Sequence, residues 1–155
     1  DFLPIDEGAR IFFDLGATAG DVDLDNVRLF EGHVGTATVG AESLGTELVL
    51  DGGFDGDAGA AWSGTGFNVT DGVNSVDISG SNPAEPWQSQ LAGTVTLVGG
   101  QGYTLSFDVS GEAGRTITAG IGESADPYRT HNKEVTLTAE TQTVTLHLIA
   151  ADGGV

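Results

Sequence analysis

The sequence predicts an all-β protein folded as an antiparallel β-sandwich of the jelly-roll type. Three observations lead to this prediction. Apolar and polar residues alternate over short runs rich in Val, Thr, Leu and Ile, glycine-containing turns separate the runs, and no stretch has the periodicity of an amphipathic helix. About eleven short strands at nearly regular spacing are typical of a sandwich or jelly roll. The 155 residues amount to one domain with a sizeable core.

Each predicted strand is an alternating run bounded by Gly, Asn or Asp. The clearest lies near the end of the chain, where Val144, Leu146 and Leu148 fall on one face and polar residues fall on the other. Segments 99–102 and 111–114 supply glycine turns between neighbouring strands. In chain order, the predicted strands span residues 9–15, 21–30, 47–50, 67–70, 75–78, 87–91, 93–97, 103–110, 115–121, 133–138 and 142–149.

The chain is strongly acidic. It carries 23 Asp and Glu residues against five Lys and Arg, for a formal net charge of −18. Such a surface repels nucleic acid and anionic membranes, so we expect neither as a partner. An excess of acids with a single lysine suits salty water, where screening weakens self-repulsion, and indicates a marine or salt-adapted bacterium. The absence of cysteine excludes a disulfide framework and fits a secreted protein.

The chain divides into two unequal pieces. Residues 32–43 are small, lack periodicity and resemble a linker. Residues 1–31 supply only about two strands, which is too few to bury a sheet face alone. These strands are therefore expected to pair with residues 44–155, so that the two pieces together form one sandwich.

Residues 82–90, Asn-Pro-Ala-Glu-Pro-Trp-Gln-Ser-Gln, are the best candidate for a binding site. Trp87 follows a proline and precedes a polar strand start with two glutamines, which is unusual for a core tryptophan. A flat indole can cover the apolar face of a pyranose while amide side chains hydrogen-bond its hydroxyls. The alternative is that Trp87 packs at the rim of the sandwich.

From Thr46 onward the chain resembles carbohydrate-binding modules of the family 4/9/22 type, which occur beside secreted glycanases. The resemblance rests on the order of several short motifs. Residues 47–55 resemble the opening strand, Trp62-Ser-Gly lies in the first loop, and 86–90 are similar to a Pro-Trp signature; 102–107 and 115–122 follow. The resemblance implies a non-catalytic jelly roll that binds polysaccharide.

The order of the strands departs from this family. Residues 9–16 and 20–30 resemble the family's last two strands, yet here they come first. The chain is therefore expected to be either a circular permutation or a piece cut out of register from a tandem array. Residues 1–31 would complete the sandwich within one chain, or by strand exchange between two chains, which would give oligomers.

The resemblance also implies a ligand cleft across one sheet face. Gln88 is expected to share a strand face with Gln90 by parity. The alternatives are that Arg10 pairs with surface acids, that Tyr128 fills a loop, and that His131 is a solvated edge residue. The implied ligand-binding residues are Trp87, Gln88, Gln90, Tyr128, Arg129, His131, Arg10 and Asp14.

The resemblance further implies a structural Ca²⁺, because family members often hold one near the chain ends. The matching positions are Gly53, Asp55, Asp71 and Asp25, which offer the hard oxygen ligands that Ca²⁺ prefers. The alternative is that these acids only shape turns.

We therefore expect a secreted binding module that holds a glycanase, attached in the same protein, on its polysaccharide. β-Glucan, including β-1,3-glucan, is the expected ligand, with xylan as the alternative. Two other classes remain open. An enzyme could use Glu123 and Asp126 as a carboxylate pair, although both lie in one exposed loop; a structural adhesion domain would use the sandwich for assembly.

Overall fold

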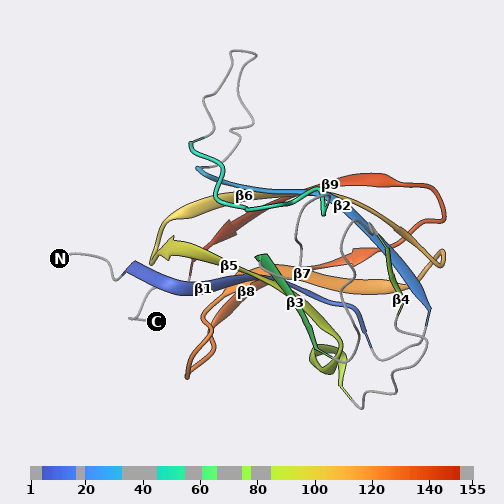
Figure 1. Cartoon of the computed structure of the whole chain (residues 1–155), viewed down its shortest axis with the longest axis horizontal. Coiled ribbons are helices and arrows are strands. Elements are labelled where there is room, and N and C mark those ends of the chain that lie inside the picture. The colour runs from blue at the N-terminus through green and yellow to red at the C-terminus, as the bar shows by residue number, and fades with distance from the viewer. Residues whose placement is uncertain are drawn as a thin grey trace.

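Two antiparallel sheets face each other in the computed structural model, which describes residues 5–16, 20–32, 45–54, 61–65, 75–77 and 85–150. Figure 1 shows the two layers, so the predicted all-β sandwich is confirmed. The sheets have the strand orders β3-β5-β1-β7-β8 and β4-β2-β6-β9. The elements are β1 (Ile5–Asp14), β2 (Asp21–Glu31), β3 (Trp62–Thr65), β4 (Ser75–Asp77), the 3-10 turn η1 (Pro86–Gln88), β5 (Gln90–Val98), β6 (Gly102–Gly111), β7 (Thr116–Gly122), β8 (Thr130–Thr136) and β9 (Gln142–Ile149).

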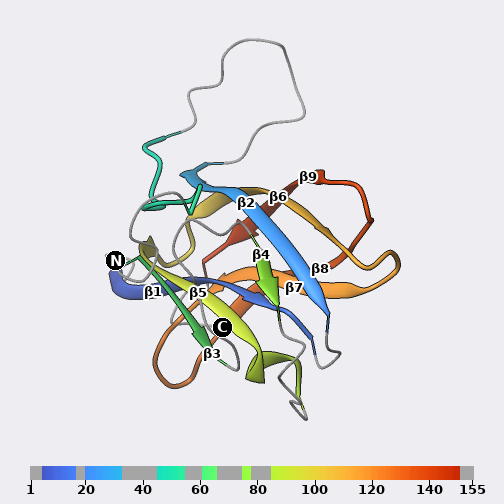
Figure 2. The ribbon, with the colours of Figure 1, turned by 45° about the vertical axis from the view of Figure 1, so that its right-hand side comes forward.

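The first two strands of the chain occupy interior positions in the two sheets. β1 pairs with β5 on one side and with β7 on the other. β2 lies in the same way between β4 and β6. Figure 2 shows both strands, in blue, running between strands that come much later in the chain. Residues 5–31 therefore supply a central strand to each sheet.

The core lies between the sheets, where alternate side chains of both meet. Phe13 from β1 contacts Phe107 from β6 edge to face, with ring centroids 5.0 Å apart. Trp62 is buried, with its ring centroid 5.1 Å from that of Phe54 in a tilted contact, and its indole N–H donates to the Asp51 carbonyl at 3.1 Å. Gly93 makes room for this indole, because a Cβ there would lie 3.1 Å from the ring.

A β-bulge in β2 changes which of its residues face the core. The register with β6 shifts between Asp25 and Arg28, and Asn26 adopts a left-handed φ of 50°. Val27 then turns inward, and its N–H donates to the Gly52 carbonyl at 2.8 Å. Only glycine fits at position 52, since a Cβ would lie 1.8 Å from the Val27 carbonyl oxygen.

Several predicted strand boundaries were wrong. The predicted strands 87–91 and 93–97 are the turn η1 followed by one continuous strand, β5. Residues 47–50 form only an isolated bridge between Glu47 and Phe30, and β3 was not predicted as a strand. Residues 67–70, and 33–43 of the predicted linker, lie outside the described part of the chain.

The described ends of the chain meet at the β5–β6 turn. Ile5 pairs with Val98, and the Ala150 N–H donates to the Gln101 carbonyl at 3.0 Å. The Gly45 N–H donates to the Glu31 carbonyl at 3.2 Å. The described residues on either side of segment 33–44 therefore lie next to each other. Within the described ranges, no helix is long and apolar enough to span a membrane.

Candidate functional site

The outer face of the five-stranded sheet, which is turned away from the core, carries a row of polar side chains. The strand register aligns Gln90 of β5 with Asp14 of β1, and Asp14 with Thr118 of β7. Thr118 is in turn aligned with Glu134 of β8. We call Gln90, Asp14, Thr118 and Glu134 the polar row. It crosses three strand spacings, roughly 14 Å.

Gln90 joins a cation and an anion on this face. Arg10 Nη1 donates to Gln90 Oε1 at 2.7 Å, and Gln90 Nε2 donates to Asp14 Oδ1 at 2.5 Å. The amide orientation is fixed by these partners, because a flip would set an N–H against the guanidinium and an oxygen against the carboxylate. Arg10 and Asp14 lie four residues apart on one face of β1, and Gln90 bridges them.

Phe12 lies beneath this bridge. Its side chain is 2% exposed, yet it is not part of the inter-sheet core cluster that contains Phe13. The guanidinium carbon of Arg10 lies 5.2 Å from the centre of the Phe12 ring, a cation–π contact. Adjacent strand residues point to opposite faces, so Phe13 faces the other sheet while Phe12 is buried on the outer side of its own sheet. Phe12 supports Arg10 instead.

The Asp14 carboxylate is partly removed from water. Burial raises its pKa above the ordinary aspartate value, while the Gln90 hydrogen bond and the charge of Arg10 act in the opposite direction. A carboxylate in this position has lost part of its hydration and gains from any further hydrogen-bond donor that approaches its free oxygen. Sugar hydroxyls are such donors.

Trp87 stands beside the polar row at the start of β5. It belongs to the turn η1, and its side chain is 58% exposed. The Leu15 N–H donates to the Ser89 carbonyl at 2.8 Å, which ties the end of this turn to the end of β1. An exposed indole is therefore held three residues from Gln90, at the same end of the sheet as Asp14.

Gln88 was wrongly placed on a strand. Pro86 begins a helical turn, in which the Gln88 N–H donates to the Glu85 carbonyl at 3.0 Å. The Gln88 Oε1 accepts the Glu85 N–H at 3.2 Å, so this amide closes its own turn. Strand parity with Gln90 does not apply to it.

The family of the chain follows from comparison with known proteins. Residues 46–149 match the model of the CBM 4/9 family, described as a carbohydrate binding domain. The chain belongs to this family of carbohydrate binding domains. No curated protein and no solved structure matches it. The matched span contains β3 to β9 of the domain and omits β1 and β2, although both strands are interior to its sheets.

The loop between β7 and β8 presents a second exposed aromatic side chain among the residues that the structure describes. Tyr128 is 56% exposed with a φ of 55°, in a turn closed by its N–H donating to the Ala125 carbonyl at 2.7 Å. The loop follows Gly122, which pairs with Arg10. Tyr128 thus belongs to the Arg10 end of the sheet, and Trp87 to the Asp14 end.

Arg129 and His131 are engaged away from the polar row. Arg129 forms a two-point ion pair with Glu123, with Nη2 2.7 Å from Oε1 and Nε 3.1 Å from Oε2. These hydrogen bonds lower the pKa of Glu123, the opposite of what a general acid in an enzyme needs. The His131 Nδ1 accepts the Ile149 N–H at 2.8 Å and joins the edges of the two sheets.

Only part of the expected calcium site falls within the described residues. Asp55 and Asp71 lie outside them. Gly53 follows Gly52, whose carbonyl accepts the N–H of Val27. Val27 in turn comes two residues after Asp25. Asp25 Oδ1 accepts the Asn26 N–H at 2.7 Å. The described residues hold no group of three or more His, Cys, Asp and Glu side chains suited to a metal ion.

Proposed function

We propose that this domain binds a neutral polysaccharide chain across the outer face of its five-stranded sheet, without catalysing a reaction. The observation that carries the proposal is the Arg10–Gln90–Asp14 bridge with an exposed indole at its end, in a member of a carbohydrate-binding family. Trp87 stacks on a sugar ring, and the bridge exchanges hydrogen bonds with its hydroxyls.

The ligand that suits this surface best is a β-glucan, with β-1,3-glucan included and xylan as the alternative. A glucan unit has more hydroxyls than a xylose unit for the guanidinium, amide and carboxylate to bind. The domain would hold an attached glycanase on this chain and so raise its effective concentration there. The net charge of −18 supports secretion into salty water.

We expect Trp87→Ala to weaken glycan binding by about tenfold or more, because the apolar contact with the sugar ring is lost. Affinity electrophoresis in gels containing laminarin, barley β-glucan or unsubstituted xylan measures this loss. Ile149→Ala is the matched control, since Ile149 is 49% exposed on the other sheet and should leave retardation unchanged. Wild-type protein that no glycan retards would favour an adhesion domain instead.

We also propose that Ca²⁺ ties the turn at Gly53 and Asp55 to Asp25 and Asp71. The described geometry that supports this is the hydrogen bond between Val27 and Gly52, which holds that turn against the β2 bulge. Carboxylate and carbonyl oxygens gathered at tight turns suit this cation.

Removing Ca²⁺ with EGTA should lower the thermal midpoint by about 5 °C or more, because an ion bound only to the folded state stabilises that state. Differential scanning calorimetry with EGTA, and again after excess CaCl₂ is restored, measures the shift. Asp25→Asn should reduce the shift. An identical midpoint in both conditions rules out a structural ion.

A further inference from the structure

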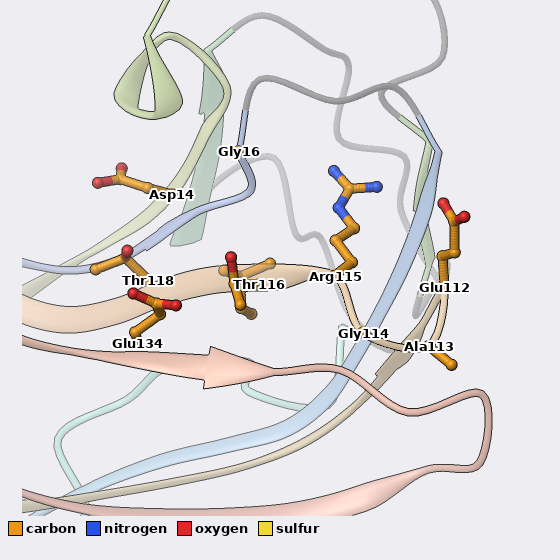
Figure 3. A pocket seen from close by; sticks show the side chains of 10 residues that line it. Asp14, Gly16, Glu112, Ala113, Gly114, Arg115, Thr116, Thr118 and Glu134 are labelled. Carbon is orange, nitrogen blue, oxygen red and sulfur yellow. The ribbon is translucent and has the colours of Figure 1, made fainter.

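The polar row ends in an open cavity of about 630 Å³. Asp14, Thr118 and Glu134 line one side of it, and the β6–β7 turn with Arg115 lines the other. Figure 3 shows the Arg115 guanidinium directed toward Gly16, and its Nη2 donates to the Leu15 carbonyl at 2.6 Å. The cavity is therefore continuous with the row and is closed at its far end by a fixed guanidinium.

The cavity differs in chemistry from the surface beside Trp87. None of the described residues that line it is aromatic. The Thr118 hydroxyl lies between the carboxylates of Asp14 and Glu134, and Thr116 lies next along β7 toward Arg115. A third carboxylate, Glu112, stands beside Arg115. Such a surface offers hydrogen bonds and no stacking. Its three carboxylates outnumber its single guanidinium.

We propose that this cavity is a second sugar subsite, which binds a further unit of the same chain through its hydroxyl groups and rejects units that carry a carboxylate. This proposal rests on the proposed function, because the first unit is held at Trp87 and Gln90. The register of the paired strands supports this proposal. Thr118 and Glu134 continue the row that Gln90 and Asp14 begin, in the direction away from Trp87.

Charge decides which sugars the subsite accepts. Hydroxyl groups donate to carboxylate oxygens in charge-assisted hydrogen bonds, which are stronger than bonds between neutral groups. A uronic acid placed here would set a fourth carboxylate among Asp14, Glu112 and Glu134, with one guanidinium to oppose them. Neutral hexose or pentose units are therefore accepted, and uronate-bearing units are excluded.

Glu134→Gln and Thr118→Val test the subsite, because each keeps the size of the side chain. We expect either variant to bind barley β-glucan oligosaccharides roughly fivefold to tenfold more weakly in isothermal titration calorimetry. Glu134→Gln should also narrow the difference in affinity between unsubstituted xylan and glucuronoxylan. Controls are Glu140→Gln, in an exposed turn, and Thr145→Val, on the outer face of the other sheet.

The outcomes separate the subsite from the proposed function. If both variants bind every glycan as the wild type does, with unchanged melting temperatures, the cavity is not a subsite, and the site at Trp87 stands. If the wild-type domain binds glucuronoxylan as tightly as unsubstituted xylan, the exclusion of uronates is wrong. If the wild type binds none of the glycans, both proposals fail.

Discussion

A fragment of residues 45–155, which contains the whole span matched by the family, will not fold by itself. It lacks β1 and β2, the strands that lie between β5 and β7 in one sheet and between β4 and β6 in the other. Burying six large core side chains on these strands contributes about 9 to 18 kcal/mol, as an upper estimate. That is of the same size as the ~5–15 kcal/mol by which a typical domain is stable, so its loss leaves no margin for folding. The six side chains are Ile11, Phe13, Val22, Leu24, Val27 and Leu29.

Circular dichroism and thermal melting measure this result. The fragment should show no cooperative transition, whereas the full chain should melt in one step. The positive control is a rearranged chain in which 45–155 precede 1–32 through a short Gly/Ser linker. We propose that the chain is a circular permutation of the family's order, so this control should fold. Ile5 pairs with Val98, and Ala150 is hydrogen-bonded to the turn that follows Val98. The new junction therefore lies at one end of the sandwich.

A fragment 45–155 that melts cooperatively would contradict this account of the fold. Light scattering on the full chain distinguishes completion of the sandwich within one chain from strand exchange. A monomer indicates that β1 and β2 pair within their own chain. A dimer indicates exchange through residues 33–44.

Alternation predicted most of the strands because strand periodicity is a local property. β6 and β9 were found to within one residue of their observed ends. The bulge at Asn26 was missed, since an extra residue in a strand depends on the partner that fixes the register; Asn, which tolerates a left-handed φ, was the available signal. The η1 turn was missed for a related reason, although Pro86 indicated a break before the strand.

The residues of the site that belong to a sequence motif were predicted. The residues whose position depends only on the strand register were missed. Gln90 and Asp14 are 76 residues apart in the chain but hydrogen-bonded in the fold, and the family resemblance brought them together. Thr118 and Glu134 have no motif, and their place in the polar row follows from the pairing of β1, β7 and β8. Phe12 could not be assigned from alternation, because Phe13 beside it fits the core equally well.

Gln90→Leu should be the most damaging single substitution on the outer face. It removes both hydrogen bonds of the bridge and leaves Asp14 and Arg10 half-buried without their amide partner. We expect the free energy of unfolding at pH 7 to fall by about 2 kcal/mol, a value that allows for partial exposure of both charges. Glycan binding should fall below detection in affinity electrophoresis, because the two charged groups lose their fixed positions.

The pH dependence of Gln90→Leu identifies the cause of this loss. Burial already raises the pKa of Asp14, and the Gln90 hydrogen bond opposes that effect. Without Gln90 the pKa rises further. A raised aspartate pKa gives a stability contribution that is present below the ordinary value of 3.8 and is lost as pH rises through the folded-state pKa. The stability difference between variant and wild type should therefore be large at neutral pH and shrink toward pH 4.

Adding Asp14→Asn to Gln90→Leu supplies the decisive comparison. The double variant has no carboxylate to desolvate, so it should be more stable at pH 7 than Gln90→Leu alone, while glycan binding stays lost. The single variant Asp14→Asn completes the cycle, because the carbonyl oxygen of the introduced amide can still accept a hydrogen bond from Gln90. If the second substitution restores no stability, the loss comes from the packing of residue 90 and not from the buried charge. Recovered stability in the double variant, together with weakened glycan binding by Asp14→Asn alone, would show that the half-buried carboxylate is kept for the ligand at the expense of the fold.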